Sequence, residues 1–341
     1  MVCASPMRDT DGGYIERQKM RDLNRKVNET YRAQARHESL RETISQAIRE
    51  LKPIPVPSDA DEIPRGRNMK ETSASLVVAL GDIHYGAKIC VKGLRGEILN
   101  EYDSCVYDER MLNLGRQIRD ILHQNRNIGD VHVLLVGDLI DGILRNKQLV
   151  HLEYGIVDST IRFAEDFSHW LLGIAAAGVR VTVHAVSGNH SEIRPLGSKK
   201  REFENENMER IILWFLKERL RDFENIFVYD DCPIYDLFSI EGYNFLLLHG
   251  DSEKKIPELA SETIQLYEKS IDFFVCGHKH REQEYPTGMT SAGNSIVIRV
   301  PSICGADSYA QSKGYGGRAG AIAMIIEKDY GRRCVYPINL Q

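Results

Sequence analysis

Several features of common protein classes are missing from this sequence. No run approaches the roughly 20 apolar residues that a membrane-spanning helix needs. The first residues, MVCASPMRD, contain no apolar stretch of signal-peptide length. The seven cysteines are odd in number, widely spaced and without a CxxC pair, which argues against a disulfide framework and against a structural zinc site. We therefore expect free thiols in a reducing compartment, and a cytoplasmic protein with no membrane partner.

Internal repeats, low-complexity segments and an excess of positive charge are also missing. The net charge of −5 and the pI near 6.2 give no global attraction to nucleic acid or to anionic membranes. A local basic face or bound metal ions remain compatible with this balance, because the formal total averages over all faces and omits ions. The 42% of apolar residues and the 27% of charged residues suffice for a sizeable globular core.

Neither glycine nor proline occurs from Tyr14 to Leu51, and apolar residues recur there at helical spacing. The pattern predicts an amphipathic helix or helix pair with nine Lys/Arg against six Asp/Glu. Such a segment packs on the core or on a second copy, or forms an arm that contacts nucleic acid, oligomerises or binds a protein partner. Four prolines within residues 51–67 then predict an extended linker. We expect a helical arm (1–52), a Pro-rich linker (53–70) and a main domain (71–341).

Beyond the linker, expected strands and helices alternate along the chain. Strands are expected near residues 76–80, 131–136, 179–186, 225–229, 234–240, 243–248 and 272–276. Helices are expected over residues 107–124, 149–177, 204–221 and 257–270. A polar loop is expected before residue 107, and residues 282–339 contain short β-like runs without a long helix. This order indicates an α/β sandwich with a mixed sheet layer.

Five of the expected strands end in the same kind of polar cluster. The clusters are Gly81-Asp82-Ile83-His84, Gly137-Asp138-Leu139-Ile140-Asp141, Gly188-Asn189-His190, His249-Gly250-Asp251 and Gly277-His278-Lys279-His280. Ligands gather at the carboxyl ends of strands in open α/β sheets, so we expect these clusters to meet. Each cluster alone is an ordinary strand end, but together they hold five of the eleven histidines. Oxygen and imidazole donors suit Mn, Fe, Zn, Co or Ni, so the joint pattern predicts a metal site of that kind.

The series GDIH, GDLID, GNH, HGD and GHKH resembles the five-motif signature of calcineurin-like metallophosphoesterases, over about residues 76–281. The segment VPSICGADSYA (300–310) is similar to metallophosphoesterases of phages and prophages. The resemblance implies a four-layer α/β/β/α sandwich with mixed β-sheets, preceded here by the N-terminal helical extension. It also implies two divalent metal ions, with Mn²⁺ expected first and Fe, Zn, Co or Ni as alternatives. Carried over by motif, one ion is held by Asp82, His84 and His280, the other by Asn189, His249 and His278, and Asp138 bridges them.

A hydrolytic mechanism follows from the same resemblance. A hydroxide that bridges two ions about 3.5–4 Å apart attacks phosphorus in line with the leaving oxygen. By motif position, His190 steadies the phosphoryl group or protonates the leaving group. Asp141 stands where the family supplies a carboxylate that fixes the tautomer of this histidine and raises its basicity.

Two departures from the family pattern narrow the expected substrate. Protein phosphatases of the superfamily carry an arginine after the second aspartate of the second motif and a glutamate after the histidine of the third. This sequence has Gly142 and Ser191 at those positions. Arg145, Lys147 or Arg194, each a few residues beyond a motif, are candidates to bind substrate phosphate instead, and each is equally suited to a solvated surface.

These departures, the phage-like tail and the basic arm favour a phosphodiesterase, more specifically a DNA nuclease. The alternative is a phosphatase or phosphodiesterase that acts on nucleotides or other small phosphoesters. A scaffold protein that has lost catalysis is a third hypothesis, and the intact set of expected ligands argues against it.

Overall fold

The computed structural model describes residues 11–55, 73–142, 151–194, 199, 202, 206–251, 256–291, 293–307 and 317–341. The chain divides into two units, Met1–Pro53 and Ile54–Gln341. From residue 56 onward, the linker predicted for residues 53–70 lies outside the described residues, and the predicted division into arm, linker and main domain stays a prediction. No helix among these residues has both the length and the apolar character that crossing a membrane requires.

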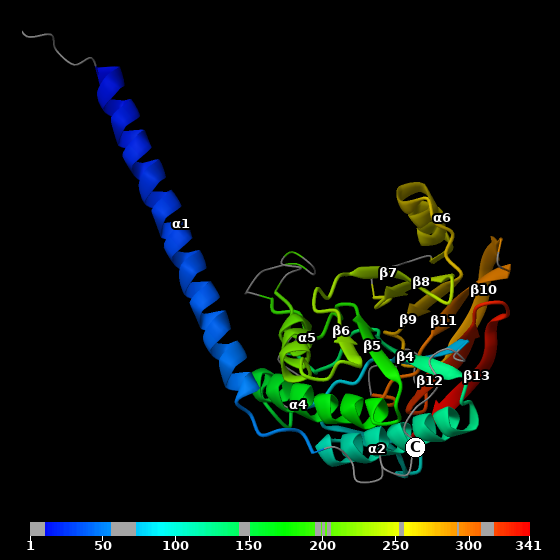
Figure 1. Cartoon of the computed structure of the whole chain (residues 1–341). Coiled ribbons are helices and arrows are strands. Elements are labelled where there is room, and N and C mark those ends of the chain that lie inside the picture. Colours follow the sequence, from blue (N-terminus) through cyan, green and yellow to red (C-terminus); the bar gives the residue numbers. More distant parts are fainter. Residues whose placement is uncertain are drawn as a thin grey trace, which may run out of the picture. The chain divides into compact units, whose positions relative to one another are not determined.

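The first unit contains one long helix, α1 (Asp11–Arg49), drawn in blue in Figure 1. It agrees with the helix predicted over residues 14–51. Each residue advances about 100° around a helix, so residues three and four apart share a face. Exposed apolar side chains share one face: Met20, Leu23, Val27 and Tyr31. Exposed arginines lie on a nearly opposite face: Arg21, Arg25, Arg32 and Arg36.

Two β-sheets form the centre of the second unit. The six-stranded sheet has the order β13 (Gly331–Asn339), β12 (Gly320–Glu327), β1 (Ala74–Leu80), β4 (Ile128–Leu135), β5 (Arg180–Ala185), β6 (Ile226–Val228). The strands from β1 to β6 in this sheet are parallel, whereas β12 and β13 are antiparallel to their neighbours. The five-stranded sheet has the order β10 (Gln283–Thr290), β11 (Gly293–Arg299), β9 (Phe273–Cys276), β8 (Tyr243–Leu248), β7 (Tyr235–Ile240). It is also mixed, because β8, β9 and β11 are parallel and the two edge strands are antiparallel.

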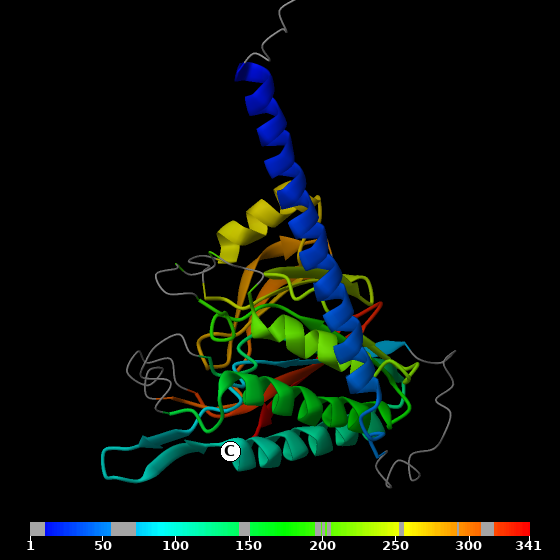
Figure 2. The same ribbon diagram turned by 90° about the vertical axis from the view of Figure 1, so that its left-hand side faces the viewer.

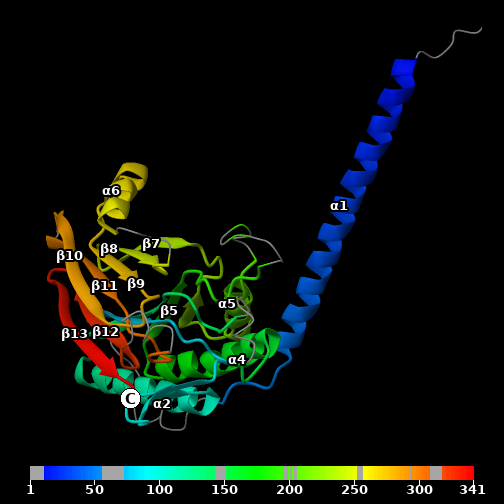
Figure 3. The ribbon, with the colours of Figure 1, turned by 180° about the vertical axis from the view of Figure 1, so that it is seen from behind.

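Helices cover the outer faces of the two sheets. Helices α2 (Ser104–Gln124) and α4 (Ile156–Ala175) run beside each other along the six-stranded sheet, and α5 (Met208–Arg219) packs on α4 (Figures 1 and 2). Helix α6 (Ile256–Tyr267) lies on the side of the five-stranded sheet (Figure 3). The order helix, sheet, sheet, helix and the mixed strand directions confirm the predicted fold class.

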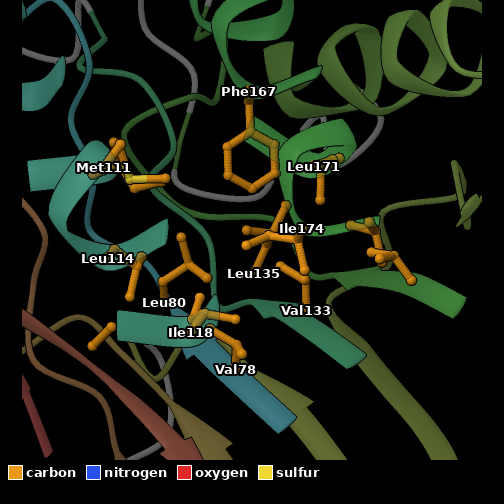
Figure 4. Packing of buried hydrophobic residues seen from close by; sticks show 14 of the residues in the cluster. Val78, Leu80, Met111, Leu114, Ile118, Val133, Leu135, Phe167, Leu171 and Ile174 are labelled. Atoms are coloured by element: carbon orange, nitrogen blue, oxygen red, sulfur yellow. The ribbon is translucent and has the colours of Figure 1, made fainter. Parts of the chain in front are cut away.

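Three hydrophobic clusters hold these four layers together. Alternate residues of a strand point to opposite faces, so Val78 and Leu80 of β1 face α2 and α4, whereas Val77 and Ala79 face the second sheet. Figure 4 shows the helix-side cluster, in which Val78, Leu80, Val133 and Leu135 meet Met111, Leu114, Ile118, Phe167, Leu171 and Ile174. A third cluster, which includes Leu246 and Phe274, lies on the outer face of the five-stranded sheet.

The structure corrects two sequence-based predictions. The helix predicted from about residue 149 begins at Ile156, because Gly155 is extended and serves as its N-cap. The polar segment predicted as a loop contains a two-stranded hairpin, β2 (Ile89–Lys92) and β3 (Ile98–Tyr102). Its strands are only four and five residues long, and most of their positions are exposed, so they lack the buried apolar run that marks a core strand.

Candidate metal centre

The five polar clusters meet at the carboxyl ends of β1, β4, β5, β8 and β9. Backbone groups of one loop bind the next loop: the Ile83 N–H donates to the Asp138 carbonyl at 2.9 Å. The His190 N–H donates to the Asp138 carboxylate at 2.7 Å, and the His278 N–H donates to the Asp82 carboxylate at 2.7 Å. Each aspartate therefore uses one oxygen to fix a neighbouring loop and keeps the other for the centre of the site.

Backbone conformation at this edge of the sheets is unusual. Left-handed φ angles between 47° and 69° occur at five predicted ligands: Asp82, His84, Asp138, His278 and His280. Non-glycine residues seldom adopt this region, and it persists where the surroundings over-determine it, often at functional sites. The turns direct all five side chains into one small volume.

Two glycines allow the second and third motifs to touch. A Cβ on Gly188 would lie 2.0 Å from the Asp138 backbone nitrogen, and a Cβ on Gly137, whose φ is +89°, would lie 2.7 Å from the Gly188 Cα. Neither distance is compatible with a side chain. These glycines let Asp138 and Asn189 approach each other through direct backbone contact.

The first group of predicted ligands contains Asp82, His84 and His280. The Nε2 atoms of His84 and His280 are 3.3 Å apart, and His280 Nε2 lies 3.8 Å from Asp82 Oδ1. His84 Nε2 also lies 4.0 Å from Asp138 Oδ2. Asp82 is fully buried, and its Oδ1 has no hydrogen-bond donor in the part of the chain that the structure describes. A buried carboxylate oxygen without a donor is costly unless a cation binds it.

The second group contains Asn189, His249 and His278, again beside Asp138. His249 Nδ1 lies 2.8 Å from the Val136 carbonyl, which can only accept, so this nitrogen carries a proton. His249 Nε2 then faces Asp138 Oδ2 and Asn189 Oδ1, each at 3.1 Å. A neutral ring would place three lone pairs against one another. A cation at this position, either a proton or a metal ion, would satisfy all three atoms; His278 belongs to the same group of closely spaced ligand atoms.

The pKa values of the side chains in the metal-free site show that this site favours positive charge. Burial opposes a charged His84, yet its hydrogen bond to Asp141 and the charge of Asp138 raise its pKa to about 9. Burial also opposes a charged His249, but Asp138 raises the pKa of that ring to about 10. The pKa of Asp138 is well below its usual range, because His249, His190 and His84 outweigh the effect of burial. His278 behaves in the opposite way: burial and the neighbouring His249 lower its pKa to about 4, which leaves it neutral and able to bind a metal ion.

His190 and Asp141 lie beside the first group. His190 Nδ1 is 2.7 Å from Asp141 Oδ1, so the carboxylate holds the proton on Nδ1. His190 is more exposed than its neighbours, with a side chain 26% accessible against 5% for His84. Asp141 also lies 3.5 Å from His84 Nδ1. One carboxylate thus orients a predicted metal ligand and the predicted catalytic histidine together.

Of the predicted phosphate-binding residues, Arg194 lies in the part of the chain that the structure describes, and it pairs with a neighbouring carboxylate. Arg194 Nε donates to Glu192 Oε2 at 2.7 Å, and the pair is largely buried. Arg145 and Lys147 lie outside the described residues. A role for these cations in substrate binding stays a prediction.

Sequence reasoning missed two residues at the site. Glu209, in the first turn of α5, is fully buried and accepts hydrogen bonds from the loops that carry Asp138 and His190. Cys304 is also fully buried, and its sulfur lies 3.9 Å from His280 Nδ1. No spacing rule connects either residue to the five motifs, and only the strongly helical pattern around Glu209 hinted that a helix begins there.

Comparisons with known proteins identify the family of this chain. The chain is 28% identical over 326 residues to the SPbeta prophage-derived uncharacterized protein YonJ of Bacillus subtilis, covering 94% of this chain and 76% of the relative. Among solved structures, a dimetal phosphatase from Danio rerio is similar at 12% identity and a TM-score of 0.34, over 79% of this chain and all of that one. Zinc-bound Vps29 from Entamoeba histolytica is similar at 14% identity and a TM-score of 0.34, over 78% of this chain and 99% of that one. The family model of the calcineurin-like phosphoesterases matches residues 75–282. The chain therefore belongs to the calcineurin-like phosphoesterase family.

Proposed function

We propose that this phosphoesterase is a dinuclear metal-dependent phosphodiesterase that cleaves DNA. The observation that carries the metal-dependent part is the convergence of His249 Nε2, Asp138 Oδ2 and Asn189 Oδ1 on one point, where a cation would satisfy all three atoms. The orphaned Asp82 oxygen beside the facing rings of His84 and His280 supports a second ion. Carboxylate, amide and imidazole donors together suit Mn²⁺, with Fe, Zn, Co or Ni as alternatives.

The ligand assignment is part of this proposal. Asp82, His84 and His280 would hold one ion, Asn189, His249 and His278 the other, and Asp138 both. When bound, the two ions supply an activated water and stabilise the charge that develops on the phosphoryl oxygens. His190 would hold or move the proton of the leaving oxygen through Nε2, because Asp141 already fixes the proton on Nδ1.

DNA is favoured over small phosphoesters by the exposed arginine face of α1. The stretch from Arg21 to Arg36 spans about 22 Å of helix at 1.5 Å per residue. Four guanidinium groups spread over this length, with Arg25 also 3.4 Å from Asp22, match the repeating phosphates of a polymer better than a single small ester. The relative from a prophage is consistent with a substrate of this kind.

A substrate panel with added Mn²⁺ tests the proposal. The purified chain is given a chromogenic phosphomonoester, a chromogenic phosphodiester, single-stranded DNA and duplex DNA. We expect DNA cleavage that is lost in Asp138→Asn and that falls by about 10²–10⁴-fold in His190→Ala. Turnover of a small ester without DNA cleavage would instead favour the phosphatase or small-molecule phosphodiesterase alternative.

A further inference from the structure

Glu209 connects the two loops that carry the centre of the site. Its Oε1 accepts the Leu139 N–H at 2.8 Å and the Ser191 hydroxyl at 2.9 Å. Its Oε2 accepts the Gly188 N–H at 2.6 Å. Each of these donors is the immediate neighbour of a residue proposed to act at the centre: Leu139 follows Asp138, Gly188 precedes Asn189, and Ser191 follows His190.

The start of α5 is built to present this carboxylate. The N-cap Asn207 accepts the Glu209 N–H at 2.9 Å, and its amide donates to the Gly188 carbonyl at 3.0 Å. Glu209 therefore sits at the positive end of the helix, where a negative charge is favoured. Two side chains of one helix turn thus bind both backbone groups of Gly188.

A buried carboxylate at this place is not required for packing. Burial of a charged group is unfavourable, and an apolar side chain of similar size would fill the space without that penalty. Burial and the nearby Asp138 charge raise the pKa of Glu209 to about 7, against the pull of its backbone donors. The carboxylate accepts hydrogen bonds from both loops at the same time, which an apolar side chain cannot do.

The loops need such a restraint, because their conformation is strained. Asp138 has a φ of 54°, and its backbone nitrogen lies so close to Gly188 that no Cβ fits between them. Residues in this region keep their conformation only where the surroundings fix it. The hydrogen bond at Leu139 fixes the peptide that follows Asp138, and the bond at Gly188 fixes the opposite loop.

We propose that Glu209 is a positioning residue for the metal centre, which sets the distance between Asp138 and the Asn189–His190 pair by clamping their two loops together. The inference rests on the proposed dinuclear site. It also accounts for Ser191, whose hydroxyl donates to a carboxylate that comes from α5.

Glu209→Gln tests this role, since it keeps the size of the side chain but replaces one acceptor oxygen with a donor. Asp272→Asn is the matched control. Asp272 is a buried carboxylate that accepts one backbone N–H, from Asn244 at 2.8 Å, and one hydroxyl, from Thr290 at 2.6 Å. It precedes β9, at the end of that strand remote from His278. Glu209 accepts three hydrogen bonds and Asp272 accepts two, each set including backbone N–H and hydroxyl donors, but only Glu209 binds the loops of the site.

We expect both variants to melt at similarly reduced temperatures, and only Glu209→Gln to bind Mn²⁺ about 10–100-fold more weakly, as for other residues that orient metal ligands. Calorimetric titration of the metal-free proteins measures this without any substrate. The absorption spectrum of the Co²⁺-loaded protein should change in Glu209→Gln and not in Asp272→Asn. Ser191→Ala, which removes one donor and keeps the carboxylate, should weaken metal binding less and in the same direction.

The outcomes separate the inference from the proposed function. If the wild-type chain binds two ions and Glu209→Gln binds them with the same affinity and spectrum, Glu209 is only structural and the inference is wrong. If Glu209→Gln does not fold, Ser191→Ala decides, and unchanged metal affinity in that variant overturns the inference. A wild-type chain that binds no divalent metal would overturn both proposals.

Discussion

Asp138 and Asp141 are three residues apart, but their surroundings give them different tasks. Asp138 touches His249 and lies near His84, between the two groups of predicted ligands, whereas Asp141 contacts His190 at 2.7 Å at the side of the site. We expect Asp138→Asn to abolish binding of two ions. Asp141→Asn should retain most of the metal and lower turnover by about 10–100-fold, because an amide holds the His190 ring without its charge.

Metal content by mass spectrometry and turnover under saturating Mn²⁺ distinguish these two variants. Asp141 also lies 3.5 Å from His84, which is a predicted metal ligand. Loss of the Asp141 carboxylate therefore also removes one contact that orients this ligand. If Asp141→Asn strips metal as completely as Asp138→Asn, the division of tasks between the two aspartates is wrong.

Protons should leave the site when metal enters. The raised pKa values of His84 (about 9) and His249 (about 10) keep both rings charged at pH 7.5 in the metal-free protein. An imidazole ligand must be neutral at the nitrogen that binds the metal, so uptake of Mn²⁺ should release about two protons, and affinity should rise with pH up to about 10. Titration calorimetry in buffers of different ionisation enthalpy counts these protons. An enthalpy that is the same in every buffer would contradict the prediction.

The same two histidines make the free energy of unfolding of the metal-free protein depend on pH in a defined direction. Their pKa values lie above the ordinary value of 6.5, so the folded state binds protons more tightly than the unfolded state. This contribution to the free energy of unfolding is complete below pH 6.5. It is lost as the pH rises through 9 and 10.

At the scale of elements, the contact between the loops after β4 and β5 is sensitive to a single methyl group. Gly188→Ala would place a Cβ 2.0 Å from the Asp138 backbone nitrogen and 2.3 Å from its carboxylate. Because the obstacle is backbone, we expect a loss of about 1–3 kcal/mol of stability together with loss of metal binding. Gly173→Ala in α4 is the control, since nothing beyond the adjacent turns of its own helix lies within 4 Å of the position that its new Cβ would take.

Thermal unfolding and metal titration measure both glycine variants. Gly173→Ala should keep its metal and gain up to about 1 kcal/mol, because alanine is the better helix former. A Gly188→Ala protein with normal metal affinity would show that the two loops can separate without consequence for the site.

Some helices and strands of this fold are predictable from the sequence, and others are not. The strands that end in the five motifs were predictable, because each is an apolar run followed by a glycine and ligand-type residues, as in VHVLLVGDLIDG. The β2–β3 hairpin was not, because its half-exposed strands lack such a run. Glu209 was not either: it reaches the site through tertiary contacts across 70 residues to Leu139, and its own segment, MERIILWF, reads only as a helix.

At the scale of the whole molecule, the two units should separate binding of a polymer from chemistry. Removal of residues 1–52 leaves Pro53 and the whole unit Ile54–Gln341, which contains the five motifs of the candidate site. We expect this truncation to weaken DNA binding at low salt and to reduce the dependence of binding on salt, because the arginines of α1 are lost. Turnover of a chromogenic phosphodiester should change less than about twofold.

Fluorescence anisotropy with labelled DNA over a series of salt concentrations measures the first effect. Light scattering of both chains shows whether the exposed apolar face of α1 also brings copies together. If the two chains bind DNA with equal affinity and equal salt dependence, the arm has no role in the proposed function. The proposal for the metal centre would not be affected by that result.

The left-handed turns at the metal site have a consequence for how this protein can change over generations. Each of the five residues in that conformation costs of order 1 kcal/mol that glycine would largely avoid. Asp82 and Asp138 bind neighbouring loops through their carboxylates, so glycine at those two positions would lose more stability than it gains. Libraries of variants sorted only for heat resistance should instead accumulate glycine at His278, and only continued demand for activity keeps that imidazole in place.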